Sequence, residues 1–99
     1  MRLICRYCRR ETSWTPPERP PHYWGIPADV VLGRRRARVM ATCPQCALAH
    51  SRANVIRARA ALASATTARE RDRAELALQR EEWAVRTKEE ALARRAARA

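Results

Sequence analysis

Apolar residues in the first half of the chain occur in short runs that charged residues, prolines and glycines interrupt. Two of these runs, residues 29–32 and residues 35–42, predict short strands joined by a turn at residues 33–34. The Pro-rich residues 15–21 predict an extended loop, because proline lacks a backbone N–H donor and restricts the residue before it. We therefore expect residues 1–46 to form a small, loop-rich head that contains a short β-hairpin.

The second half of the chain follows a helical pattern. Residues 47–99 contain no proline, glycine or cysteine, and they consist largely of Ala, Arg, Glu and Leu, which favour helix. Bulky apolar residues recur there at intervals of seven, as in a coiled coil whose parallel dimer would place Glu75 near Arg80 of a second chain. The residues of this predicted seam are Leu48, Val55, Leu62, Leu76 and Trp83.

Residues 64–67 interrupt the helical pattern and leave two architectures open. Thr67, followed three residues later by Glu70, matches a capping box that would begin a second helix. An antiparallel hairpin of two helices would bury the first three seam residues against Leu76 and Trp83. No glycine or proline marks a turn, however, so the favoured prediction is a single long or gently broken helix.

Four cysteines in the head form two C-x2-C pairs separated by 34 residues, Cys5/Cys8 and Cys43/Cys46. Two such turns bring four thiolates onto one tetrahedral cation, and this closed set leaves no position for a substrate. We therefore predict one structural Zn²⁺ ion, with disulfides, redox chemistry or an iron–sulfur cluster as the alternatives. His50, four residues after Cys46, is a further candidate, either as a ligand or as a hydrogen-bond donor to a thiolate.

The order of these motifs resembles a treble-clef zinc finger, with a zinc ribbon as the close alternative. Residues 3–50 carry Cys-x2-Cys, then Tyr23-Trp24-Gly25, a hydrophobic run and Cys-Pro-x-Cys-Ala, which is similar to small zinc-finger proteins of high-GC actinobacteria and their phages. The resemblance implies nucleic-acid or protein partners. The expected fold is thus a small α+β zinc finger over residues 1–46, followed by a long helix or a helical hairpin over residues 47–99.

Length and motif content argue against an enzyme. A chain of 99 residues buries a limited core, the sequence has no Gly-rich phosphate loop, and neither histidine has a recognisable nucleophile partner. No apolar window approaches the length that spans a bilayer, and the first residues lack a secretory apolar stretch. We expect a cytoplasmic location, or the host cytoplasm for a phage protein.

The strongest signal of a partner is positive charge. Twenty arginines and one lysine against ten acidic residues give a formal net charge of +11. Guanidinium groups suit phosphate, because their planar fork donates two hydrogen bonds at once. The leading hypothesis is a regulatory zinc-finger protein that binds DNA or RNA. The predicted contact residues are Arg6, Arg9, Arg10, Arg34, Arg35, Arg36, Arg38, Arg52 and Arg59.

Other interpretations of the charge stay open. An adaptor could dock on a larger assembly, such as RNA polymerase, a ribosome or a phage particle, and the helix could also form a homodimer. The arginines could alternatively be solvated charge in an Arg-rich sequence. Aromatic residues beside the arginines could stack on bases or pack over the cysteine turns. These aromatic residues are Tyr7, Trp14, Tyr23 and Trp24.

Overall fold

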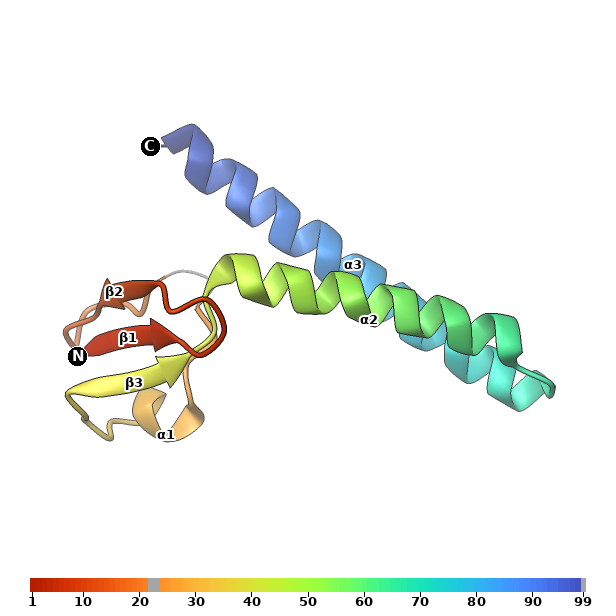
Figure 1. Cartoon of the computed structure of the whole chain (residues 1–99), viewed down its shortest axis with the longest axis horizontal. Coiled ribbons are helices and arrows are strands. Elements are labelled where there is room, and N and C mark those ends of the chain that lie inside the picture. Colours follow the sequence, from red (N-terminus) through yellow and green to blue (C-terminus); the bar gives the residue numbers. More distant parts are fainter. Residues whose placement is uncertain (22–23, 99) are drawn as a thin grey trace. The chain divides into compact units, whose positions relative to one another are not determined.

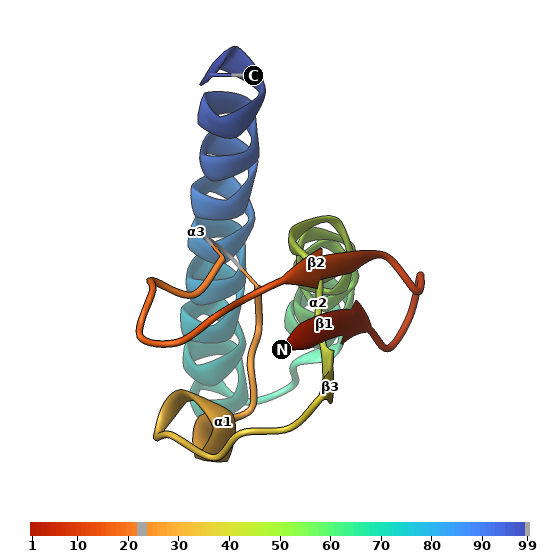
Figure 2. The same cartoon turned by 90° about the vertical axis from the view of Figure 1, so that its left-hand side faces the viewer.

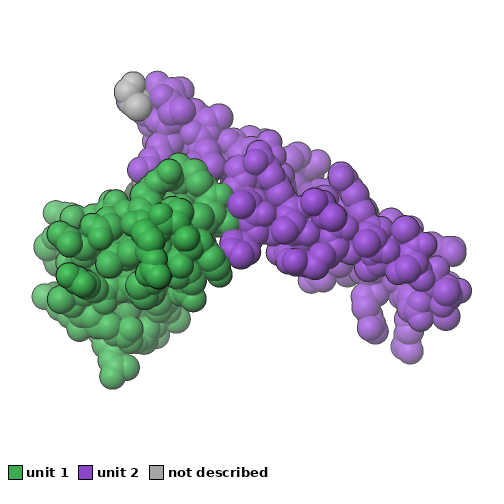
Figure 3. Space-filling view, viewed as in Figure 1, with its two compact units in different colours: residues 1–47 green, residues 48–99 purple. Residues whose placement is uncertain are grey.

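The chain folds into two compact units, Met1–Ala47 and Leu48–Ala99 (Figure 3). The computed structural model describes residues 1–21 and 24–98, so Tyr23 and its predicted stacking role lie outside the described residues. The expected small α+β zinc-finger-like domain followed by long helical structure is confirmed. No helix in the described part of the chain is long and apolar enough to cross a bilayer. The elements in chain order are β1 (Arg2–Cys5), β2 (Glu11–Ser13), α1 (Ala28–Val31), β3 (Arg38–Ala41), α2 (Pro44–Ser64) and α3 (Ala68–Arg98) (Figure 1).

A three-stranded sheet in the order β2-β1-β3 forms the first unit. β1 and β2 are antiparallel and enclose the turn with the first cysteine pair, whereas β3 returns from the far end of the unit and pairs with β1 in parallel (Figure 2). In this register, Leu3 lies opposite Thr12 of β2 and opposite Val39 of β3. The hairpin therefore lies at β1–β2, and the predicted hairpin within residues 29–42 is wrong.

The two faces of this sheet differ because successive side chains of a strand point to opposite sides. Leu3 and Cys5 of β1 and Val39 and Ala41 of β3 face the interior and are fully buried or nearly so. Arg2, Ile4, Arg38 and Met40 alternate with them and therefore lie on the opposite, open face. The core on the closed face consists of Leu3, Cys5, Trp14, Trp24, Val30, Val39, Ala41 and Cys43.

Residues 28–31 form the short helix α1 where the sequence predicted a strand. The helix ends in a Schellman arrangement, in which the N–H of Gly33 donates to the Val30 oxygen and the N–H of Arg34 donates to the Asp29 oxygen. Gly33 has a φ of +116°, a conformation that side chains with a Cβ rarely adopt. The sequence predicted correctly that the element ends at Gly33. It did not predict the type of element, because a run of three apolar residues does not distinguish a helix from a strand.

The second unit is an antiparallel helical hairpin, so the alternative prediction is confirmed and the favoured one, a single long or gently broken helix, is wrong. α2 ends at Ser64 and α3 begins at Ala68. Two ion pairs connect the helices in antiparallel register, Arg52 with Glu89 at 3.6 Å and Arg59 with Glu82 at 4.0 Å. The Lys88 ammonium also donates to the Ser51 hydroxyl. Both glutamates are thus engaged within the chain by arginines of α2.

The phase of the apolar seam was predicted correctly on α2 and wrongly on α3. Leu48 and Val55 are buried on α2 at their interval of seven, and Ser51 and Ala58, three residues after each of them, are buried as well. On α3 the buried residues are Ala74 and Ala91, whereas Leu76 and Trp83 are 55% and 63% exposed. A second set of apolar residues, half-buried on the side of Ala74, also repeats at an interval of seven. The spacing in the sequence therefore could not distinguish the buried side of α3 from the exposed side. The residues of this second set are Leu78, Val85 and Leu92.

The predicted cap at the start of α3 is confirmed. The Thr67 hydroxyl accepts a hydrogen bond from the N–H of Glu70 at 3.1 Å. The Glu70 carboxylate reaches back to Thr66, where it accepts from the backbone N–H at 3.0 Å and from the hydroxyl at 3.2 Å. Hydrogen bonds from Thr66 hold the pKa of the Glu70 carboxyl below its usual value of 4.5. Two polar side chains therefore replace the glycine or proline that the turn lacks.

Candidate metal centre

Two different local structures present the four cysteines. Cys5 is the last residue of β1, and the turn that leads into β2 carries Cys8. Cys43 directly precedes α2, and Cys46 lies in its first turn. Gly25 and Thr42 exchange two backbone hydrogen bonds of 2.9 and 3.1 Å, which fix the chain immediately before Cys43. The site thus joins the first hairpin of the unit to the start of α2.

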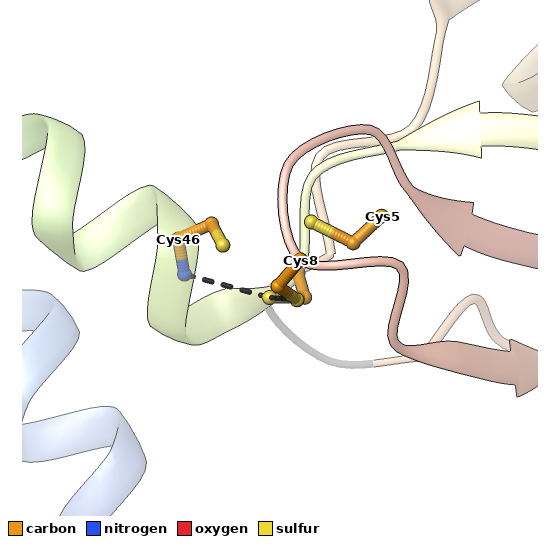
Figure 4. Close-up of side chains that lie close together, drawn as sticks. Cys5, Cys8 and Cys46 are labelled. Atoms are coloured by element: carbon orange, nitrogen blue, oxygen red, sulfur yellow. Dashed lines mark hydrogen bonds between the residues drawn. The ribbon is translucent and has the colours of Figure 1, made fainter.

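The four sulfur atoms converge on one point. They all lie within 4.8 Å of one another, and the sulfur atoms of Cys8 and Cys43 are 3.5 Å apart. Figure 4 shows Cys5 and Cys8 on one side of the cluster and Cys46 on the other. Zn–S bonds of about 2.3 Å in a tetrahedron separate the sulfur atoms by about 3.8 Å. The observed spacing fits one Zn²⁺ ion, so the four cysteines form a single candidate zinc site.

Electrostatics explain why this cluster favours a divalent cation. Burial raises the pKa of the Cys5 thiol, but backbone N–H groups that include those of Cys8 and Cys43 outweigh burial and lower this pKa to about 6. At Cys46, burial and the neighbouring sulfur atoms raise the pKa to about 12. Burial likewise raises the pKa of Cys43, although the N–H of Cys46 donates to its sulfur at 3.4 Å. A cation at the centre would relieve the repulsion between the thiolates, and all four would then ionise.

The chemistry of this donor set is structural. Four thiolates complete the tetrahedral shell of Zn²⁺, which leaves no open position for water or substrate. All four cysteines are free thiols in the structure. His50 is exposed and is not a member of the cluster, so its predicted role as a ligand is not supported. The role that fits is to hold the β1–β2 turn against the start of α2.

The predicted phosphate-binding arginines are all exposed, but their surroundings divide them into two groups. Arg34 and Arg36 both form ion pairs with Asp29, and Arg52 and Arg59 pair with glutamates of α3. The second group has no ion pair with any residue in ranges 1–21 and 24–98. It consists of Arg6, Arg9, Arg10, Arg35 and Arg38.

Part of the unpaired group gathers on the open face of the sheet. Arg38 lies beside Arg2 in the register of β3 and β1. The Arg6 guanidinium donates to the main-chain oxygen of Met40 at 3.4 Å, which places it along β3. Ile4 and Met40 are neighbours in the same register and supply an apolar centre between these cations. This face was not predicted, although the alternation of Arg2, Ile4 and Arg6 along the first strand was a signal for it.

The predicted aromatic contacts are largely internal. Trp14 and Trp24 are only 6% and 8% exposed and belong to the core, so of the two predicted alternatives packing is confirmed for them and stacking on bases is not. The Trp14 indole N–H donates to the main-chain oxygen of Glu18 at 2.9 Å. Tyr7 is 55% exposed in the first cysteine turn and stays a candidate for stacking. Both indoles pack inside the small core, so neither is available to stack on a base.

Comparison of the chain with protein-family models, curated proteins and solved structures found no match.

Proposed function

We propose that this protein is a non-enzymatic zinc-finger protein that binds nucleic acid through the phosphate backbone. The observation that carries this proposal is that five of the predicted contact arginines are exposed on the first unit and have no ion-pair partner among the described residues. An unpaired guanidinium binds phosphate without first breaking an internal pair, so these five contribute most of the expected affinity. The paired arginines at positions 34, 36, 52 and 59 contribute less.

The charge of the first unit supports a polyanionic partner. Residues 1–47 contain nine arginines and three acidic residues, which gives a formal charge of +6. A Zn²⁺ ion with four thiolates carries a net −2, so the zinc-bound unit would retain about +4. Since each guanidinium that contacts phosphate releases a condensed counterion, affinity is expected to depend steeply on salt.

The backbone at Arg9 is a second line of support. This residue has a φ of +64°, in the left-handed region where glycine carries no steric penalty. A side chain there costs about 1 kcal/mol or more, so replacement by glycine relieves strain while it removes the guanidinium. An arginine at a position that favours glycine is consistent with a binding role for its side chain.

The test is the salt dependence of binding to labelled DNA and RNA, in single-stranded and duplex form, measured by fluorescence anisotropy. In the test variant, Arg9→Gly, Arg10→Ala and Arg38→Ala are combined, and the log–log slope for duplex DNA should flatten by about 2.7. The matched control removes the same charge from paired residues, through Arg34→Ala, Arg52→Ala and Arg59→Ala. This control variant should flatten the log–log slope much less than the test variant does. The absence of binding at low salt, or equal losses in both variants, would overturn the proposal.

A second candidate function is an adaptor that binds a protein. It is favoured by the exposed Leu76 and Trp83, which lie seven residues apart on the side of α3 opposite the hairpin seam. Exposed tryptophans are frequent at the centres of protein interfaces. Immobilised protein would retain one defined partner from a nuclease-treated lysate if this function is correct, and Trp83→Ala would abolish the retention. Loss of all partners after nuclease treatment would exclude it.

A further inference from the structure

A cavity of about 320 Å³ lies in the first unit between the Pro-rich loop and the end of α1. Its walls are mostly apolar and include Trp14, Pro16, Pro20, Val30 and Val31. This volume lies at the lower end of the range that protein pockets for small ligands occupy, and apolar walls with a few polar groups are typical of them. The cavity is separate from the cysteine cluster, since none of the four cysteines lines it.

Hydrogen bonds hold the walls of this cavity in place. Met1 and Trp14 are joined in both directions, because the terminal ammonium donates to the Trp14 oxygen at 2.6 Å and the Trp14 N–H donates to the Met1 oxygen at 2.9 Å. The Trp14 indole N–H donates to Glu18, and the Glu18 N–H donates to Thr15 at 3.0 Å. The loop is therefore tied to the sheet at several points, and a ligand would meet a largely preformed site.

Two residues with charged side chains, Glu18 and Arg35, are among those that line the cavity. Asp29 forms ion pairs with Arg34 and Arg36, the neighbours of Arg35 on both sides. Arg35 itself has no ion pair with a residue in the described part of the chain. A cation and a hydrogen-bond acceptor thus border the same apolar space, and a complementary ligand carries an anion, a flat apolar body and an N–H donor.

We infer that this cavity takes one unstacked nucleobase that bears an exocyclic amino group, with the phosphate of the same nucleotide bound by Arg35. The inference rests on the proposed function and refines it, because it names a single-stranded segment as the target of the first unit. Adenine, cytosine and guanine carry the amino group that the Glu18 carboxylate would accept from, whereas thymine and uracil do not. A purely acidic peptide fits less well, since Glu18 would repel it.

The experiment uses the full zinc-bound chain and labelled oligonucleotides of equal length, oligo(dC), oligo(dT) and a duplex. Val31→Trp places a large side chain in the cavity wall, and Leu32→Trp makes the same change at the next, exposed residue, which does not line the cavity. Val31→Trp should weaken oligo(dC) binding about tenfold and leave duplex binding unchanged. Leu32→Trp should change neither. Zinc content and thermal unfolding verify that both variants are folded.

A second variant tests the acceptor without any change in shape. Glu18→Gln replaces the carboxylate by an amide, which donates as well as accepts. The preference for oligo(dC) over oligo(dT) should therefore shrink, while binding of the duplex stays close to that of the unaltered chain. Equal binding of the two oligonucleotides by the unaltered protein would overturn the assignment of the base.

The outcomes separate this inference from the proposed function. If Val31→Trp leaves oligo(dC) binding intact while the variant with changes at Arg9, Arg10 and Arg38 loses affinity, the cavity is not a base site and the proposed function stands. If no oligonucleotide binds at low salt, both are overturned. If Val31→Trp and Leu32→Trp weaken binding equally, the effect comes from the surface of α1 and the inference is again wrong.

Discussion

Removal of the metal should unfold the first unit, because the zinc site outweighs the apolar core. Among the described residues, the core buries the side chains of Leu3, Val30 and Val39 completely and the indoles of Trp14 and Trp24 almost completely. Burial of such a side chain contributes about 1.5–3 kcal/mol, so the five together contribute about 8–15 kcal/mol before conformational entropy is subtracted. Zinc binding by a small finger contributes about 10–16 kcal/mol at neutral pH. Since conformational entropy reduces the contribution of the core, the loss of zinc exceeds the net stabilisation that the apolar core supplies.

Tryptophan emission gives an assay that is specific to this unit. Trp14 and Trp24 are buried in it, whereas Trp83 belongs to α3 and is exposed, so a Trp83→Phe background isolates the two buried indoles. A zinc chelator should shift their emission to longer wavelength and remove their near-ultraviolet circular dichroism. Added Zn²⁺ should restore both signals. Cys43→Ser should produce the unfolded spectrum without chelator, and Thr42→Ser, one residue earlier and outside the cluster, should not.

The result that would refute this reasoning is a zinc-free protein with unchanged emission. Metal content, measured on the same sample, must be zero for that result to count. It would mean that the four sulfur atoms converge through packing of the polypeptide alone and that the core is more stable than its few buried side chains indicate. The assignment of a structural zinc site would then be wrong.

Two further predictions concern the hairpin. Leu78→Ala should lower its free energy of unfolding by about 1–2 kcal/mol, because Leu78 is half-buried on the side of Ala74, whereas Leu76→Ala should cost about 0.5 kcal/mol or less. Thermal unfolding followed by helical circular dichroism measures both, and the reverse order would support a seam through Leu76. Since the pKa of Glu70 is lowered in the folded chain, its stabilisation is present above the usual carboxyl pKa of 4.5 and is lost as the pH falls through the lowered value. Glu70→Gln should therefore destabilise the hairpin at neutral pH and have little effect in strong acid, and a constant difference across this range would contradict the cap.

The features that were predicted correctly depend on residues that are close together in the sequence. A C-x2-C pair converges on a cation because three peptide units form its turn, whatever surrounds it. The cap formed by Thr67 and Glu70 spans three residues, and Gly33 ends α1 through its own backbone conformation. The metal site and two element boundaries were therefore available from local chemistry.

Failures occurred where local patterns are compatible with more than one structure. The apolar residues of α1 suit a strand as well as a helix, and the backbone hydrogen bonds of the folded chain, such as that from the Leu32 N–H to the Ala28 oxygen, distinguish the two. On α3, two sets of apolar residues repeat at intervals of seven, on opposite sides of the helix. The set that faces α2 is selected by the packing of small residues such as Ala74 and Ala91 and by the ion pairs across the hairpin.

The sequence by itself determined the four thiol ligands, the division into a cysteine-bearing head and a helical segment, and the excess of arginine. Tertiary structure alone decided the parallel pairing of β3 with β1, which arginines are occupied by acidic partners, and that the Pro-rich loop encloses a cavity lined by Arg35 and Glu18. The physical reason is distance along the chain. Thiols three residues apart meet through one turn, whereas a salt bridge between α2 and α3 or a wall shared by residues 14 and 35 exists only after distant segments have packed.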